Sequence, residues 1–376
     1  MQHINLSYSW TPHSESAGSR NRLSPIRNPL MDMLQAVRES GSIGAAAKSM
    51  QLSYRHVWGE LKRWEQVLDQ PLILWEKGQA ARLSEFADKL LWAERQAQAR
   101  LSPQISALQA ELEKTFAVAF DANSHLLTVY ASHDDALVRL REHAAEQALH
   151  LDMRFCGSVD ALRSLNEGRC NVAGFHAPMQ PSPRSLVART YKPLLRTGQH
   201  KLIGFALRQQ GLMVTPGNPR RIQQLSDLTQ AGLRYINRSL GTGTRLLLDD
   251  ALLSAGIAAR QITGYDQEES SHAAVAAAVA AGVADAGLGI ASAAQAQGLD
   301  FVPLMQECYW LVCLKSVLET PSVQAMTRVL QSDAWQQHMT TLPGYETTEL
   351  AGQVQSLKKA LPWWHFKTGH NTHTAY

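Results

Sequence analysis

The sequence is poor in the features that would tie the chain to a metal, a disulfide framework or a membrane. It has four cysteines in 376 residues, and none of them shows the CxxC spacing of metal or redox motifs. We expect reduced thiols inside a core, as in cytoplasmic proteins. No apolar run is long enough to span a bilayer, and the N-terminus lacks a basic segment followed by an apolar one. The sequence therefore predicts a cytoplasmic protein without a membrane partner.

The usual catalytic and nucleotide-binding motifs are also missing. The sequence contains no GxSxG, HExxH or GxxxxGK[ST] string. Asp249 and Asp250 are adjacent in a predicted helix, so they do not share a face and cannot form an acid–base pair. The histidines near the C-terminus are too loosely spaced to predict a metal site. We expect no enzyme, no metal and no covalent cofactor.

The charge of the chain is nearly balanced, with a formal net charge of +3. A hydrophobic content of 45% and a charged content of 18% are typical of a folded chain, and the length predicts two or three domains. So small a net charge does not indicate a nucleic-acid partner. A DNA-binding role must therefore rest on a local motif.

Residues 28–83 contain such a motif. Asn28 and Pro29 are typical of a helix start, as a capping side chain and a first helical position. A short alanine-rich helix, a tight turn and a helix from Ser53 to about Leu68 follow. Because small residues allow two helices to cross closely, this pattern predicts a helix-turn-helix. The alternative is a small helical bundle with a solvated polar face.

The second helix of the motif has two faces. Val57, Leu61 and Trp64 recur at helical spacing and predict a buried stripe. The opposite face is polar, its first turn lies where a recognition helix meets base edges, and its later cations lie where a phosphate backbone passes. We expect the DNA contacts to come from Ser42, Ser53, Tyr54, Arg55, His56, Lys62 and Arg63.

A wing and a long linker are predicted next. Residues 72–75 indicate a strand, residues 77–81 a short wing and residues 82–83 the returning strand. Ser84 caps a helix, and Ser102-Pro103 predicts the start of a further helix. The apolar seam on these helices lacks an obvious cover in its own chain. We therefore expect a homodimer or a homotetramer, although packing of the seam on its own winged domain is an open alternative.

The order of these parts resembles the N-terminal domains of LysR-type and ModE-type (molybdate-dependent) bacterial regulators, on the stretch GSIGAAAKSMQLSYRHVWGELKRWEQVLDQPLI. Further on, TVYASHDDAL, GSVDALRSLNEGRCNVAGFHAP, INRSLGTGTRLLLDD and SSHAAVAAAVAAGVADAGLGI together resemble the periplasmic-binding-protein-like domain of molybdate-type regulators and molybdopterin-biosynthesis proteins. The resemblance implies an α/β chain: an N-terminal winged helix-turn-helix and linker helix, then a two-lobed type 2 periplasmic-binding-protein-like domain.

The apolar pattern supports that architecture independently. Six apolar strand candidates between residues 126 and 290 alternate with helical segments, as a mostly parallel sheet requires. Residues 207–214 and 307–314 are the predicted crossings between two lobes. We expect five parts: a mobile arm (1–27), a winged helix-turn-helix (28–83), a linker and dimerisation helix (84–116), a two-lobed domain (117–342) and a C-terminal tail (343–376).

The stretch YINRSLGTGTRLLLDDALL predicts a strand, a Gly/Thr turn and a helix. Free amides at a helix N-terminus favour an anion, and loops that follow neighbouring strands converge at one edge of a sheet. The alternative is an ordinary turn whose glycines only fit the chain. We expect an effector site formed by Ser132, His133, Asp134, Gly157, Ser158, Asn237, Arg238, Gly241, Thr242, Gly243, Thr244, Arg245 and His272.

These observations predict a transcriptional regulator whose binding to double-stranded operator DNA is modulated by a small anion. The resemblance implies molybdate, tungstate or a molybdopterin-related species, and molybdoenzyme genes such as those of formate dehydrogenase as targets. A small carboxylate such as formate would accept the same hydrogen bonds. A ligand carrier or cofactor-insertion module that does not bind DNA is the alternative from a different class.

Overall fold

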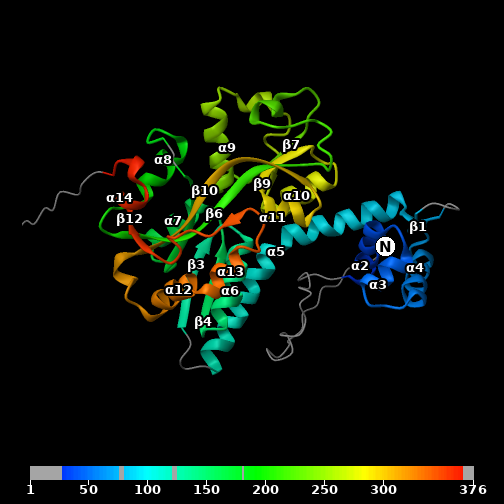
Figure 1. The fold of residues 1–376 in the computed structure, drawn as a ribbon, viewed down its shortest axis with the longest axis horizontal. Helices are drawn as coiled ribbons and strands as arrows, with labels where there is room; N and C mark the ends of the chain where they lie inside the picture. The colour runs from blue at the N-terminus through cyan, green and yellow to red at the C-terminus, as the bar shows by residue number, and fades with distance from the viewer. Residues whose placement is uncertain (1–27, 76–79, 121–124, 180–181, 367–376) are drawn as a thin grey trace, which may run out of the picture. The chain divides into compact units, whose positions relative to one another are not determined.

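The computed structural model describes residues 28–75, 80–120, 125–179 and 182–366 (Figure 1). The expected mobile arm, most of the expected wing and the histidine-rich end of the chain lie outside these residues. The chain divides into two compact units, residues 1–102 and 103–376.

The first unit contains the predicted helix-turn-helix. The Asn28 side chain accepts a hydrogen bond from the Leu30 amide at 3.0 Å, and Gly41 ends the first helix in the left-handed conformation that glycine tolerates best. The Ser53 hydroxyl caps the third helix by accepting a hydrogen bond from the His56 amide. The helices are α2 (Pro29–Ser40), α3 (Ile43–Ser49) and α4 (Tyr54–Leu68).

The two faces predicted for α4 are confirmed. Val57 and Leu61 are buried, and Trp64 packs against the same core. A short antiparallel pair follows, formed by β1 (Ile73–Leu74) and β2 (Arg82–Leu83), as the sequence predicted.

Helix α5 (Glu85–Phe120) is a single helix of 36 residues, and it contains Pro103. The prediction of a new helix at Ser102-Pro103 is wrong. A proline inside a helix removes one hydrogen bond, but contacts beyond it can maintain the helix. Here the Arg141 guanidinium donates a hydrogen bond to the Ser106 carbonyl at 2.8 Å, and Ala110 is buried in the core.

Within the described residues, the second unit is built on a 10-stranded mixed sheet. Eight of its strands follow the path β4-β3-β5-β10-β6-β9-β7-β8, and two short strands near the C-terminus pair with β6 off this path. Its centre is an antiparallel pair of 15-residue strands, β6 (His200–Val214) and β10 (Asp300–Leu314), which Figure 1 shows passing through the middle of the domain. They contain the two predicted crossings, which are thereby confirmed. One lobe adds β3 (His125–Ala131), β4 (Leu149–Phe155) and β5 (Val172–Pro178); the other adds β7 (Tyr235–Arg238), β8 (Glu268–Glu269) and β9 (Ala286–Ile290).

Helices cover this sheet and follow the strands as the alternating pattern predicted (Figure 1). None of the helices in the described ranges is long and apolar enough to cross a bilayer. Their bounds are α6 (Asp135–Ala145), α7 (Ser158–Asn166), α8 (Leu186–Tyr191), α9 (Gly243–Ser254), α10 (His272–Ala280), α11 (Ala291–Ala296), α12 (Pro321–Gln331), α13 (Asp333–Met339) and α14 (Leu357–Ala360).

The predicted C-terminal tail from residue 343 is wrong for most of its length. Strands β11 (Tyr345–Glu346) and β12 (Val354–Ser356) both pair with β6, and α14 follows them. The Trp364 side chain is 0% exposed. These strands are too short to produce an apolar pattern in the sequence. The two-lobed domain therefore extends to the end of the described residues.

Candidate functional site

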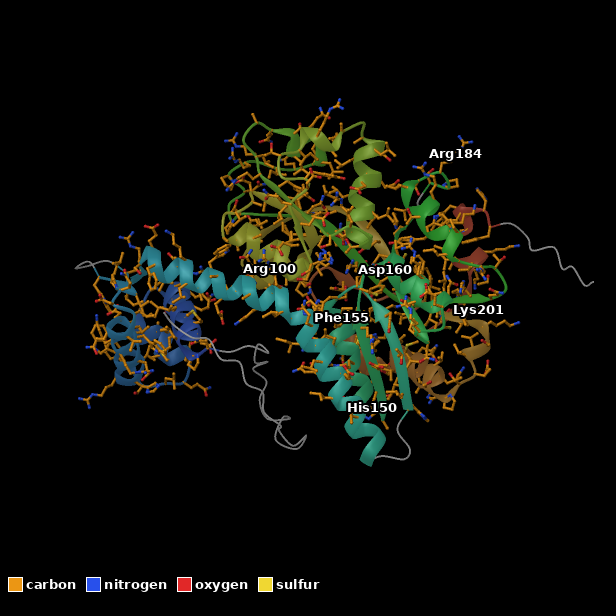
Figure 2. All side chains as sticks on the ribbon, turned by 180° about the vertical axis from the view of Figure 1, so that it is seen from behind. Arg100, His150, Phe155, Asp160, Arg184 and Lys201 are labelled. Carbon is orange, nitrogen blue, oxygen red and sulfur yellow. The ribbon has the colours of Figure 1, made fainter. Side chains whose placement is uncertain are left out.

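A cavity of about 550 Å³ lies in the second unit. Helix α5 forms one wall, and the loops that follow β3, β4, β7 and β8 form the others. Figure 2 labels His150 and Phe155 toward opposite ends of β4, and Phe155 lines the cavity. The loops after β3, β4, β7 and β8 contribute Ser132, His133, Cys156, Gly157, Ser239, Leu240, Thr242 and Ser270. Strand β4 contributes Asp152, Arg154 and Phe155, and β7 contributes Arg238.

Arg238 is the buried cation of this cavity. Its side chain is 2% exposed, one of its terminal nitrogens donates a hydrogen bond to the Glu269 carbonyl at 3.1 Å, and its Nε has no hydrogen-bond partner. Among the residues that the structure describes, no carboxylate forms an ion pair with it. Burial and the nearby Arg208 guanidinium lower the pKa of Arg238 to about 9, against the opposing effect of Glu269. Arg238 is therefore a cation at neutral pH whose charge is incompletely compensated.

Uncharged polar groups line the same cavity as Arg238. The Ser132 and Ser158 hydroxyl oxygens lie 3.4 Å apart, and the buried His133 Nε2 has no partner. Burial lowers the pKa of His133, which makes its neutral form dominant at neutral pH. The Thr242 hydroxyl caps α9, since it accepts a hydrogen bond from the Arg245 amide at 3.3 Å. One buried positive charge with neutral donors is an arrangement that suits an anion.

The loops of the two lobes touch beside the cavity. A Cβ atom at Gly157 would lie 2.5 Å from the Gly241 carbonyl oxygen, so a side chain at position 157 would push the loops apart. Gly241 itself has a φ of 81°, in the region that glycine adopts without strain. Gly157 thus allows the loops of the two lobes to approach closely, and Gly241 allows the turn before α9 to adopt a left-handed backbone conformation.

A second buried arginine, Arg208 on β6, lies between two carboxylates. Its Nε lies 2.6 Å from a Glu307 oxygen, and a terminal nitrogen pairs with Asp134. Burial alone would lower the pKa of Arg208, but Glu307 and Asp134 together raise it above its usual range. Tyr345 also donates a hydrogen bond to Asp134, at 2.8 Å. Sequence reasoning missed Arg208 and Glu307, although the polar run RQQ inside an apolar strand was a usable indication.

The structure divides the predicted effector residues into two groups. Ser132, His133, Gly157, Arg238 and Thr242 line the cavity, while Ser158 and Gly241 contact residues of its wall. The others are engaged elsewhere. Asp134 forms an ion pair with Arg208, and the Asn237 side-chain amide donates a hydrogen bond to the Tyr265 carbonyl. The Thr244 hydroxyl accepts a hydrogen bond from Gln210 and contacts His272. Gly243 packs near Ser158 and His176.

Arg245 does not contribute to the cavity wall in this structure. Its guanidinium pairs with Asp249 at 3.1 Å and with Glu268 at 2.8 Å, and it stacks 4.4 Å from the centre of the Tyr265 ring. Because Asp249 lies four residues further along the same helix, it reaches Arg245 directly. The expectation that Arg245 binds an anion is corrected on this ground.

The exposed face of α4 contains the residues expected to contact DNA. Tyr54 is 53% exposed and stacks on Trp58, with ring centres 6.3 Å apart, while Arg55 and His56 are exposed beside it. Ser42 and Ser53 are helix caps, so their hydroxyls already accept backbone hydrogen bonds.

The two later cations of α4 are paired within the helix. Lys62 lies 2.7 Å from Glu65, and Arg63 lies 2.6 Å from Glu60. The first turn of α4 is therefore its least compensated basic region.

Two family descriptions match this chain. Residues 30–88 match the bacterial regulatory helix-turn-helix protein, lysR family, and residues 140–331 match the PBP superfamily domain. The PBP match contains most of the two-lobed domain, and the lysR match contains the whole helix-turn-helix.

Two relatives share parts of the sequence. The uncharacterized protein YvgK of Bacillus subtilis (strain 168) is 35% identical over 202 residues, which is 54% of this chain and 64% of that protein. An uncharacterized protein in the ferredoxin 2Fe-2S gene 5' region of Clostridium pasteurianum is 34% identical over 113 residues, which is 30% of this chain and 100% of that protein.

Solved structures of similar proteins include an OxyR cysteine mutant of Corynebacterium glutamicum, with a TM-score of 0.42, 18% identity and coverage of 84% of this chain and 95% of that one. Full-length CbnR in complex with its target DNA has a TM-score of 0.42 and 15% identity, and the match covers 81% of this chain and 99% of CbnR. The chain therefore belongs to the PBP superfamily, and it also contains a helix-turn-helix that is similar to that of the bacterial lysR family.

Proposed function

We propose that the chain is a LysR-type DNA-binding transcriptional regulator, and that its affinity for operator DNA changes when a small anion binds at Arg238. The observation that supports the proposal is the buried, incompletely compensated charge of Arg238 in the wall of a cavity. Burying such a charge is costly, and an anion that binds beside it relieves the cost. An effector needs a coupling of only about 1–3 kcal/mol to change operator affinity several-fold to a hundred-fold.

The DNA-binding surface in this proposal is the first turn of α4. Tyr54, Arg55 and His56 are exposed there, in the part of a recognition helix that meets base edges. Lys62 and Arg63 would contact phosphates after exchanging their glutamate partners. The regulator would act as a homodimer or homotetramer, with half-sites separated by about 34 Å or a multiple of it.

The chemical nature of the anion belongs to the same proposal. Molybdate, tungstate and molybdopterin-related species are candidates because of the resemblance to molybdate-type regulators, and molybdoenzyme genes are the corresponding targets. Formate is the alternative among small carboxylates. The hydroxyls of Ser132 and Thr242 and the Arg238 guanidinium are suitable donors for any of them.

The test uses the full chain and a DNA ligand selected from a random library. Affinity for the selected DNA is measured with and without molybdate, tungstate, sulfate and formate at fixed ionic strength. We expect at least one anion to change DNA affinity in the wild type and in Arg234→Met, which removes an exposed cation near β7. Arg238→Met should lose the response while it still binds DNA. A response that survives in Arg238→Met would exclude this site.

A further inference from the structure

Helix α5 provides one face to the cavity. Its contribution comes from Pro103, Gln104, Ala107, Leu108 and Glu111, whose spacing of three and four residues places them on one side of the helix. Leu108 is 51% exposed although it lines a cavity. An apolar side chain in that position gains from a ligand that covers it.

The size of the cavity distinguishes between the candidate anions. A volume of about 550 Å³ falls within the roughly 300–1,000 Å³ of pockets that enclose drug-sized ligands. A tetrahedral oxyanion or formate bound at Arg238 would leave most of this space, including the walls at Leu108 and Phe155, in contact with water. A ligand with an organic body would fill it.

The charges around the cavity also discriminate between classes of ligand. Arg238 is buried in one wall, whereas the carboxylates of Asp152 and Glu111 line other parts of the same cavity, with Arg154 at β4. A second negative charge placed beside Asp152 or Glu111 would be repelled, and Arg154 is exposed, so water screens its attraction for such a charge. The arrangement favours a ligand with one anionic end and an uncharged body.

We propose that the effector is an organic anion that binds with its charged end on Arg238 and its apolar body against α5. This inference rests on the proposed function and specifies its ligand class. Helix α5 is continuous from Glu85 to Phe120, so the ligand contacts the same helix that begins directly after the helix-turn-helix. The effector site thus includes residues of the linker, in addition to the loops of the two lobes.

The experiment is calorimetric titration of the full chain with three monocarboxylates of increasing size, formate, butyrate and phenylacetate, and with molybdate as a bare oxyanion. We expect phenylacetate to bind at least about tenfold more tightly than formate or molybdate, because it buries apolar surface on Leu108 and Phe155. Ala107→Trp fills the cavity beside α5 and should abolish the tighter binding of phenylacetate, while formate affinity is unchanged. Gln109→Trp places the same side chain at an exposed position that does not line the cavity, and should preserve the tighter binding.

Two outcomes overturn the inference: formate or molybdate binds as tightly as phenylacetate, or Ala107→Trp leaves phenylacetate affinity unchanged. Failure of the proposed function has a different signature. In that case Arg238→Met binds every anion as the wild type does, or the wild type binds none of them.

Discussion

At the scale of single residues, the two buried arginines differ in how their charges are compensated. Arg208 has two carboxylate partners and is 1% exposed, while Arg238 is buried to nearly the same extent without an ion-pair partner among the described residues. Burial penalises both charges, but only Arg208 recovers the penalty within the protein. Arg208 is therefore compensated within the protein, and Arg238 is the residue to which the proposed function assigns an anion.

We predict opposite effects on stability for the two matched substitutions. Arg208→Met should destabilise the domain by about 3–5 kcal/mol, because it leaves the buried Asp134 and Glu307 carboxylates without their partner. Arg238→Met should keep or raise the free energy of unfolding, because it removes a charge that folding desolvates. Urea unfolding of both variants measures the contrast. Equal losses would show that Arg238 is compensated by its surroundings.

Anion affinity should also depend on pH in a defined direction. The pKa of Arg238 is lowered to about 9 in the free protein, and a bound anion would raise it again. Affinity should therefore be constant below pH 9 and should fall as the pH rises above it, because the unliganded site then loses its proton. Titration with formate between pH 7 and 10 tests this. A decline centred well below pH 8 would assign the effect to another group.

The sequence predicted part of this site and not the rest for physical reasons. Ser132 and Gly157 follow strand ends, Arg238 is the last residue of β7, and strand ends are visible in the apolar pattern. The pairing of Arg245 with Asp249 could also be predicted from the sequence, because side chains four residues apart on a helix lie side by side. The Arg208 and Glu307 pair depends on the register between β6 and β10, which no local pattern encodes.

At the scale of elements, the helix starts of the DNA-binding unit were the most predictable part of the chain. Asn28, Ser42 and Ser53 each accept a hydrogen bond from an amide of the helix that they precede. Helix α5 was mispredicted because tertiary contacts beyond Pro103 outweigh the local preference of proline. Local rules thus succeed where the determining contacts are local.

The pairing pattern on α4 leads to a prediction on DNA binding. Arg55→Ala should weaken binding to a selected operator by about 1–3 kcal/mol and relax its sequence preference, as loss of a base contact does. Lys62→Ala should cost less and act uniformly across sequences, because Lys62 must first leave Glu65 to reach a phosphate. Fluorescence anisotropy with selected and scrambled duplexes separates the two effects. A larger and sequence-specific loss for Lys62→Ala would reverse the assignment of the contacts.

At the scale of the whole molecule, the second unit is organised by strands that both lobes share. Strand β6 pairs with β10, with β9 of one lobe and with β11 and β12 near the C-terminus. The sheet order was predictable only in outline, because long-range pairing of short strands leaves no periodic trace. The C-terminal residues therefore complete the lobe that begins about 220 residues earlier at β3.

The contribution of the C-terminal residues to stability should be measurable at two adjacent tryptophans, Trp363 and Trp364. Trp364 is fully buried against Phe175 and Tyr191, with ring centres 6.4 Å away in each case, whereas Trp363 is only partly buried. Trp364→Ala should lower the free energy of unfolding by about 3–5 kcal/mol, and Trp363→Ala by clearly less. Thermal and urea unfolding of both variants provide the comparison. Because Trp364 packs in the core behind β5 and β10, an equally small loss for both variants would mean that residues beyond 343 do not stabilise the domain.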